Sequence, residues 1–274
     1  MTIRIASMHI APVKSLALAP IERAMLDKAG IAGDRAFHLI DERGRLFTQR
    51  ECPSLVRVRA AYDVADDVLR LTFGAEGSPA EGSPGRGRDG RVVEGVPEPG
   101  EAIETAFWGG RPVPGRVMRG GFAEALSEVS GQPLRLVRPD NRGDAFDGYP
   151  ISLCSMESVE ALAHAAGRDA IDGRRFRQNI YITGAAAHGE DEWLGGAVRA
   201  GGTLLRVEAR DSRCVMTTHS PDTGEHDLDT LKIIASYRTD QPKEVNFGVY
   251  CTVIEPGEAA AGDEVLPVDA MATA

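Results

Sequence analysis

The sequence predicts a mainly β protein with a few helices, in the α+β class. Short runs of alternating apolar residues dominate the first half of the 274 residues, and glycine and proline separate these runs. Many short strands punctuated in this way favour a barrel or a sandwich over a sheet built from strand–helix–strand units. Three other segments have the apolar spacing of amphipathic helices, which accounts for the helical part of the prediction.

The strands are predicted from alternation, in chain order. The first run, residues 3–10, changes the phase of its apolar residues midway, which indicates a β-bulge. Residues 36–41 and 46–49 flank a turn that contains Gly44, and we expect them to form a hairpin. Further strands are predicted over residues 56–62, 69–73, 103–108, 179–183, 205–209 and 247–253.

The three helices are predicted from spacing and end signals. Residues 122–129 have helical spacing, and Gly131 follows as a stop. Ser155 is a candidate N-cap for a helix over residues 156–166, because its hydroxyl can accept a backbone hydrogen bond in the first turn. A short helix is expected over residues 228–234.

Residues 74–100 interrupt the strand pattern. They are rich in glycine and proline, and the pentapeptide AEGSP occurs twice in succession, at 75–79 and 80–84. Such a segment buries little apolar surface, so we expect a long, mobile hairpin insertion. Residues 85–90 spell GxGxxG, but no strand precedes them and no helix can follow, which argues against a dinucleotide site. The boundary between the two halves is expected near residues 139–148.

Composition restricts the function. The net charge is −10, which argues against a protein that coats nucleic acid or binds membranes through a polybasic face. The sequence has no apolar run long enough for a membrane span and no secretory signal, and its four cysteines are too few for a disulfide scaffold. We therefore expect a cytoplasmic protein. Arginine far outnumbers lysine, which fits either a GC-rich genome or the binding of oxyanions.

Cys214 is the most informative cysteine. It follows a predicted strand in the segment Ser212–Thr218, so it should lie where a strand meets a loop. A free cysteine is often a small buried hydrophobe. Here Arg213 and the neighbouring hydroxyl groups instead favour the thiolate, which binds soft metals or attacks electrophiles. Cys214 could also be grouped with His219 and His226 as zinc ligands, but that spacing fits no standard zinc pattern.

Two basic motifs complete the candidate site. Pro12–Ser15 places a lysine and a hydroxyl on the loop after the first strand, and Arg174–Asn179 carries three guanidinium groups into a later strand. Such clusters are usually solvated surface. If the two loops converged in the fold, they would instead clamp a phosphate group.

Taken together, these segments resemble the MOSC family, the domain shared by the C-termini of molybdenum cofactor sulfurases and the mitochondrial amidoxime-reducing component. The resemblance runs in order along nearly the whole chain. The matching segments are residues 12–15, 33–35, 47–50, 53–55, 175–179, 212–214, 217–218, 221–224, 228–232, 247–248 and 262–265.

The resemblance implies an N-terminal β-barrel-like domain over residues 1–140 and a β-barrel MOSC domain over residues 141–269. It also implies a molybdenum cofactor whose protein ligand is the thiolate of Cys214. The other cofactor-binding residues that it implies are Lys14, Ser15, Arg35, Arg177, Asn179, Ser212 and Arg213, with Lys14 on the pterin phosphate. The sequence departs from the family pattern at Gln178, where proline is usual, and at Tyr149-Pro150, where small hydroxyl residues are common.

The implied activity is the reduction of N-hydroxylated (N–O) compounds with electrons from a separate ferredoxin-like, flavin or haem protein. An alternative is a carrier of sulfur or of the cofactor, in which Cys214 holds a persulfide or a metal without independent turnover. A third interpretation is a binding module without metal. The family is also associated with pyridoxal phosphate binding.

Overall fold

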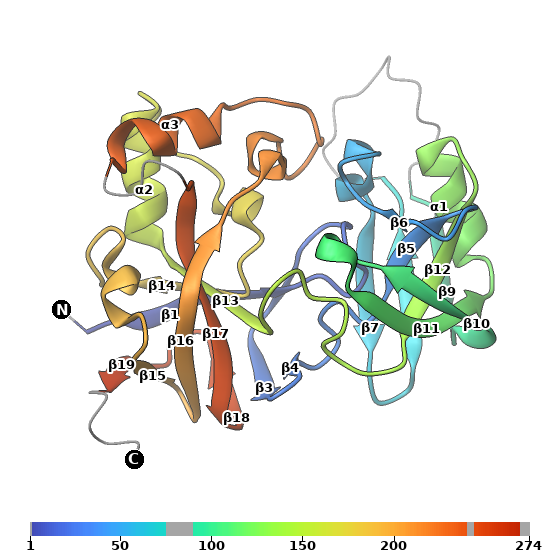
Figure 1. Ribbon diagram of the computed structural model, residues 1–274, viewed down its shortest axis with the longest axis horizontal. Coiled ribbons are helices and arrows are strands. Elements are labelled where there is room, and N and C mark those ends of the chain that lie inside the picture. Colours follow the sequence, from blue (N-terminus) through green and yellow to red (C-terminus); the bar gives the residue numbers. More distant parts are fainter. Residues whose placement is uncertain (1, 75–89, 240–243, 269–274) are drawn as a thin grey trace.

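The computed structural model describes residues 2–74, 90–239 and 244–268, and it has two lobes that lie side by side (Figure 1). The described residues are mainly strand with three α-helices, which confirms the predicted α+β class. Their strands form four sheets.

One lobe is built on an eight-stranded sheet that takes strands from both ends of the chain. In spatial order its strands are β19 (Val265–Val268), β15 (Ala197–Ala200), β16 (Thr203–Ser212), β17 (Asn246–Glu255), β13 (Ile151–Ser155), β14 (Ile180–Thr183), β1 (Arg4–Ile10) and β2 (Ala19–Ile21). Neighbouring strands are antiparallel except β13 and β14, which are parallel and joined through a helix. The register of β1 shifts between Ile5 and Ser7, which confirms the predicted bulge.

The other lobe holds a five-stranded and a three-stranded sheet (Figure 1). The five strands are β10 (Glu98–Ala106), β11 (Pro112–Arg119), β12 (Leu134–Pro139), β5 (His38–Asp41) and β6 (Leu46–Phe47), and the three are β7 (Arg59–Asp63), β8 (Val68–Thr72) and β9 (Val92–Gly95). The pairing of β5 with β6 confirms the predicted hairpin. A fourth sheet pairs a late strand with two early ones: β18 (Gly257–Ala260), β3 (Arg23–Asp27) and β4 (Gly30–Ile31).

The helices begin and end close to where the sequence predicts. They are α1 (Phe122–Ser130), α2 (Met156–Ala165) and α3 (Thr230–Tyr237), with 3-10 turns η1 (Pro53–Arg57), η2 (Trp108–Gly110), η3 (Gly173–Phe176), η4 (Gly189–Trp193) and η5 (Val215–Thr218). Gly131 ends α1 with φ at +70°, a conformation that glycine adopts without a steric penalty. The Ser155 hydroxyl accepts a hydrogen bond from the Ser158 amide, which confirms the predicted N-cap of α2. None of the helices in the described ranges has the length and apolarity to cross a membrane.

The two largest of four hydrophobic cores in the described residues follow the lobes. One core combines buried residues of the first 31 positions with residues 151–265, and the other lies between Val13 and Leu136. The expected division into residues 1–140 and 141–269 stays a prediction. In the structure, β1 to β4 pair with one another or with strands of the second half, and the chain then crosses into the other lobe.

Two sequence-based expectations need correction. The strand expected over residues 56–62 is β7, but it begins only at Arg59. Residues 53–57 form the 3-10 turn η1, because Pro53 sets the first helical φ and removes a strand hydrogen-bond donor. The predicted insertion 74–100 is also shorter than expected, since β9 pairs with β8 and β10 begins at Glu98. The AEGSP repeats, and the mobility expected for residues 75–89, lie outside the described residues.

Candidate functional site

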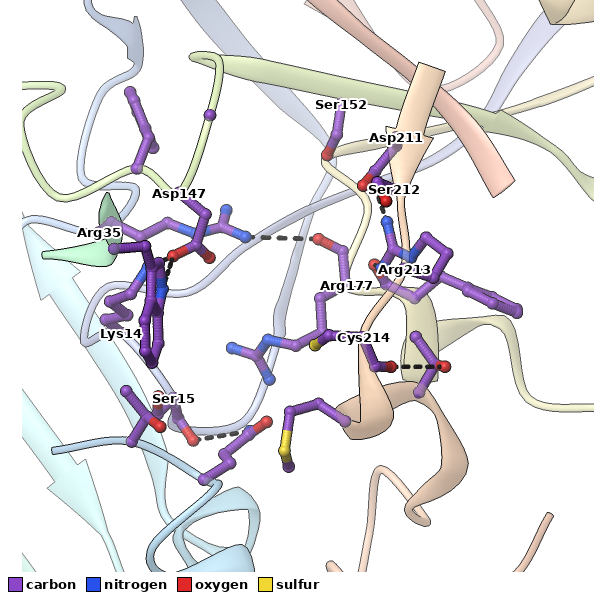
Figure 2. A pocket seen from close by; sticks show the side chains of 18 of the residues that line it. Lys14, Ser15, Arg35, Asp147, Ser152, Arg177, Asp211, Ser212, Arg213 and Cys214 are labelled. Atoms are coloured by element: carbon purple, nitrogen blue, oxygen red, sulfur yellow. Dashed lines mark hydrogen bonds and ion pairs between the residues drawn. The ribbon is translucent and has the colours of Figure 1, made fainter. Parts of the chain in front are cut away.

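A cavity of about 240 Å³ lies where the two lobes meet (Figure 2). We call the lobe with the five-stranded sheet the first lobe and the lobe with the eight-stranded sheet the second lobe. The cavity is lined by loops of the first lobe and by residues near the ends of β13, β14, β16 and β17 of the second lobe. The structure brings the eight residues that the family resemblance implies into this one cavity: Lys14, Ser15, Arg35, Arg177, Asn179, Ser212, Arg213 and Cys214. His219 and His226, the other members of the possible zinc set, do not line it. The two basic motifs therefore converge, which the sequence alone could not establish.

Lys14 enters the cavity from the loop after β1. A hydrogen bond from the Lys14 amide to the Phe37 carbonyl holds this loop against the segment that precedes β5. The Lys14 side chain is 8% exposed, and its ammonium group donates to the Ala145 carbonyl at 3.1 Å and to the Asp147 carboxylate at 2.8 Å. Burial lowers the pKa of Lys14, and the ion pair with Asp147 opposes that shift.

Arg35 lies in the loop between β4 and β5, on the same side of the cavity as Lys14 (Figure 2). It pairs with Asp34, whose side chain is fully buried, and its guanidinium donates to the Arg177 carbonyl at 3.3 Å. Burial disfavours the charge on Arg35, but Asp34 outweighs it and the pKa of Arg35 is raised. Asp34 also accepts hydrogen bonds from the Ala11 amide at 2.7 Å and from the Asn179 amide group at 2.9 Å.

The Asn179 side chain links several segments of the cavity wall through hydrogen bonds. Its amide group donates to Asp34 and to the His9 carbonyl, and its side-chain oxygen accepts from the backbone and hydroxyl of Ser152. These contacts use the full hydrogen-bonding capacity of an asparagine side chain. Asn179 therefore positions the loops that line the cavity.

Arg177 has no carboxylate partner among the described residues, unlike Lys14, Arg35 and Arg213. Its guanidinium donates to the Leu16 carbonyl at 2.8 Å, and among the described residues it forms no ion pair. Burial, together with the nearby charge of Arg35, lowers the pKa of Arg177 to about 10. The residue lies between the Lys14 side of the cavity and the Cys214 side (Figure 2).

Three lining residues hold backbone conformations that are unfavourable for side chains other than glycine. Ser15, Arg35 and Arg177 have φ values of +76°, +46° and +55°. Each such residue costs on the order of 1–3 kcal/mol and persists only where the surroundings enforce it. Only five non-glycine residues of the described chain share this property, so its concentration at one cavity marks the site as functional.

Cys214 is the accessible thiol of the chain. It follows β16 as the sequence predicts and caps η5, and its carbonyl accepts a hydrogen bond from the Thr217 hydroxyl at 3.1 Å. Of the four free cysteines it alone is half-buried, while the other three are buried. Burial raises the pKa of Cys154 and of Cys251, so those thiols are inert.

Arg213 fixes the segment that carries Cys214. It pairs with Asp211, donates to the Phe176 carbonyl, and lies over the Phe176 ring at 5.4 Å from the ring centroid. Burial opposes its charge, but Asp211 raises the pKa of Arg213 overall. Ser212, between these two residues, is exposed to the cavity mouth.

Several lining residues were missed by sequence reasoning. Asp147 binds Lys14 and also accepts from the Trp108 indole at 2.7 Å, while Arg50 lies over the Trp108 ring at 4.4 Å. Arg50 belongs to the segment 47–50, which matches the family pattern. Asp147 lies in a loop and Trp108 in the turn η2, and no motif or periodic spacing in the sequence distinguishes either residue. Gln178 is buried and donates to Asp211 at 3.1 Å, so this departure from the family pattern is accommodated by a hydrogen bond.

The cavity is basic in an acidic protein. Six of its lining side chains are lysine or arginine and two are aspartate, although the whole chain carries a net charge of −10. The cluster of cations, in which Arg177 has no carboxylate partner among the described residues, can bind an anion. The half-buried thiol of Cys214 can bind a soft metal or react with an electrophile. The arrangement can therefore hold a ligand that combines an anionic group with a thiophilic centre.

Comparisons with known proteins give matches along most of the chain. Family models match the chain as a MOSC domain over residues 140–266 and a MOSC N-terminal beta barrel domain over residues 2–87. Mitochondrial amidoxime-reducing component 1 of Homo sapiens is 28% identical, and the match covers 95% of this chain and 82% of that protein. Molybdenum cofactor sulfurase of Drosophila erecta is also 28% identical, over 92% of this chain but only 32% of the sulfurase. The YuaD protein of Bacillus subtilis matches in structure with 16% identity and a TM-score of 0.43, over 97% of this chain and 94% of that one.

Proposed function

Because this chain belongs to the MOSC domain family, we propose that it is a molybdenum-cofactor-dependent oxidoreductase that reduces N-hydroxylated compounds with electrons from a separate redox protein. One observation carries the proposal: the half-buried thiol of Cys214 shares a cavity with Lys14, Arg35, Arg177 and Arg213. The amidoxime-reducing relative matches this chain over 95% of its length, which supports the choice of reaction.

The residues present fit such a cofactor on chemical grounds. Arg177 offers a buried guanidinium with no carboxylate partner among the described residues, as a cofactor phosphate requires, and Lys14 and Ser15 line the same cavity. Cys214 offers the soft ligand that suits molybdenum. We assign Lys14, Ser15 and Arg177 to the phosphate, Cys214 to the metal, and Arg35, Asn179, Ser212 and Arg213 to the lining of the cofactor. When bound, the cofactor supplies the two-electron redox chemistry.

The protein's own contribution is orientation and charge. Asn179 and Asp34 hold the loops of the two lobes together, and the Arg213–Asp211 pair holds the segment that presents Cys214. Converting R–NH–OH to R–NH₂ and water consumes two electrons and two protons. A separate ferredoxin-like, flavin or haem protein would deliver the electrons singly.

A second candidate is a carrier of sulfur or of the cofactor. The sulfurase relative favours it, because the match covers 92% of this chain, and so does the accessibility of Cys214 to a sulfur donor. In that function Cys214 would carry a persulfide, which mass spectrometry detects as one added sulfur atom. Pyridoxal phosphate binding and a cytoplasmic location stay predictions.

Turnover of an amidoxime with reduced viologen as the electron donor tests the proposal. We expect the loaded wild-type protein to form the amidine, and Cys214→Ser to be inactive. Cys52→Ala is the matched control, since Cys52 does not line the cavity and this variant should keep the activity. A loaded protein that never turns over, but accumulates persulfide on Cys214, would favour the carrier.

A further inference from the structure

A second, smaller pocket lies behind Arg177. It has a volume of about 50 Å³ and shares Arg177 with the cofactor cavity. Its other arginines come from both lobes: Arg57 ends η1, Arg59 begins β7, and Arg174 lies in η3. The pocket therefore lies at the junction of the lobes, and neither Lys14 nor Cys214 lines it.

The charges in this pocket are not balanced within the described chain. Asp222 is its only carboxylate among the described residues, and it is already paired with Arg174 at 3.0 Å. Arg57, Arg59 and Arg177 form no ion pair with any described residue. The Nε of Arg57 is also buried without a hydrogen-bond partner, which is costly for a charged group.

We infer that this arginine pocket is a second anion site, which binds one tetrahedral oxyanion of the phosphate or sulfate class. Guanidinium groups present paired donors that match the oxygens of such ions. A water molecule needs about 10–15 Å³ of comparable space, so a volume of 50 Å³ admits a group of a few atoms and excludes a nucleotide.

The bound anion would link the two lobes. Arg57 and Arg59 belong to the first lobe, and Arg174 and Arg177 to the second, so one ion in the pocket contacts both. It would offset the repulsion among these like charges, and it would lie next to Arg177, which also lines the cofactor cavity. The inference is independent of the proposed reaction, because it requires neither cofactor nor turnover.

Calorimetric titration of inorganic phosphate into the full chain tests the inference, with chloride used to keep the ionic strength constant. We expect saturable binding, competition by sulfate, and at least a tenfold loss of affinity in Arg57→Gln/Arg59→Gln. The matched control is Arg116→Gln/Arg119→Gln, which removes two exposed arginines of β11 and changes the net charge equally. This control should bind phosphate within twofold of the wild type.

A third variant separates the pocket from the cofactor cavity. Lys14→Gln changes the cavity alone and should leave phosphate binding in the arginine pocket within twofold. Loss of binding in Lys14→Gln with retention in Arg57→Gln/Arg59→Gln would place the anion in the cavity and overturn the inference. Equal losses in both double variants, or no saturable binding, would overturn it as well. Melting curves verify that each variant is folded, and Arg59→Gln alone replaces the double variant if that one is not.

Discussion

Replacing Arg177 should stabilise the protein without its cofactor while weakening its hold on the cofactor. Arg177 is a partly buried cation, forms no ion pair among the described residues, and has φ at +55°. A buried charge without a partner destabilises the folded state, and a site prepared for an anion tolerates that cost because the ligand removes it. Arg177→Gln removes the charge and keeps a shorter polar side chain.

The size of the effect follows from the pKa. Burial, and then Arg35, lower the pKa of Arg177 to about 10, against about 12.5 for an exposed arginine. A difference of one in pKa corresponds to about 1.4 kcal/mol, so at neutral pH, where both states are charged, the folded state bears a cost of about 3 kcal/mol. Loss of the hydrogen bond to the Leu16 carbonyl offsets about 1 kcal/mol. The net gain of about 2 kcal/mol should raise Tm by about 4–8 °C.

Thermal and urea unfolding of the cofactor-free chain at pH 7 measure this effect. Arg175→Gln is the matched control, because its guanidinium is 3% exposed but paired with Asp227 at 3.1 Å. Arg175→Gln leaves Asp227 without its ion-pair partner, so it should lower the free energy of unfolding by about 1–3 kcal/mol. The reasoning is refuted if Arg177→Gln melts below the wild type, or if both variants change stability in the same direction and by similar amounts.

Three further predictions concern single side chains. Cys214→Ser should lose reductase activity but unfold within about 0.5 kcal/mol of the wild type, since the change is small and half-exposed; a large loss of stability would show that Cys214 is instead a packing residue. A thiol-reactive dye should label one cysteine rapidly in the native chain and none in Cys214→Ser, because the other three are buried; two or more rapid reactions would contradict the burial pattern. Burial raises the pKa of Glu190 above its ordinary value, so its stabilising contribution is present below pH of about 4.5 and is lost as pH rises through the folded-state value. Glu190→Gln should therefore match the wild type in acid and be more stable at pH 7, and urea unfolding at both pH values measures the difference.

Local signals were sufficient for the helices and for the identity of most site residues. The N-cap at Ser155 and the stop at Gly131 act within one turn of the chain, so the sequence around them determines the ends of α2 and α1. The family resemblance is confirmed by both domain matches. It led to residues that the structure places in one cavity, and their individual roles stay proposals.

Long-range pairing and isolated residues were beyond the sequence. Asp147 meets Lys14 across 133 positions of chain, and Trp108 joins them from the turn η2. No local periodicity encodes such a meeting. The same holds for the pairing of β3 with β18, which places residues of the N-terminal half against the end of the chain. The strand expected over residues 56–62 is present as β7 but begins only at Arg59, because Pro53 starts the 3-10 turn η1 and alternation alone does not register that effect.

The molybdenum content of the purified chain tests the central claim most directly. The protein and its Cys214→Ser and Cys52→Ala variants would be produced in a host that makes the molybdenum cofactor, and molybdenum would be quantified by mass spectrometry with the pterin measured by fluorescence. We predict about one molybdenum and one pterin per chain for the wild type and for Cys52→Ala, and loss of molybdenum in Cys214→Ser. A wild-type chain without molybdenum, from cells in which another molybdenum enzyme is fully loaded, would contradict the account.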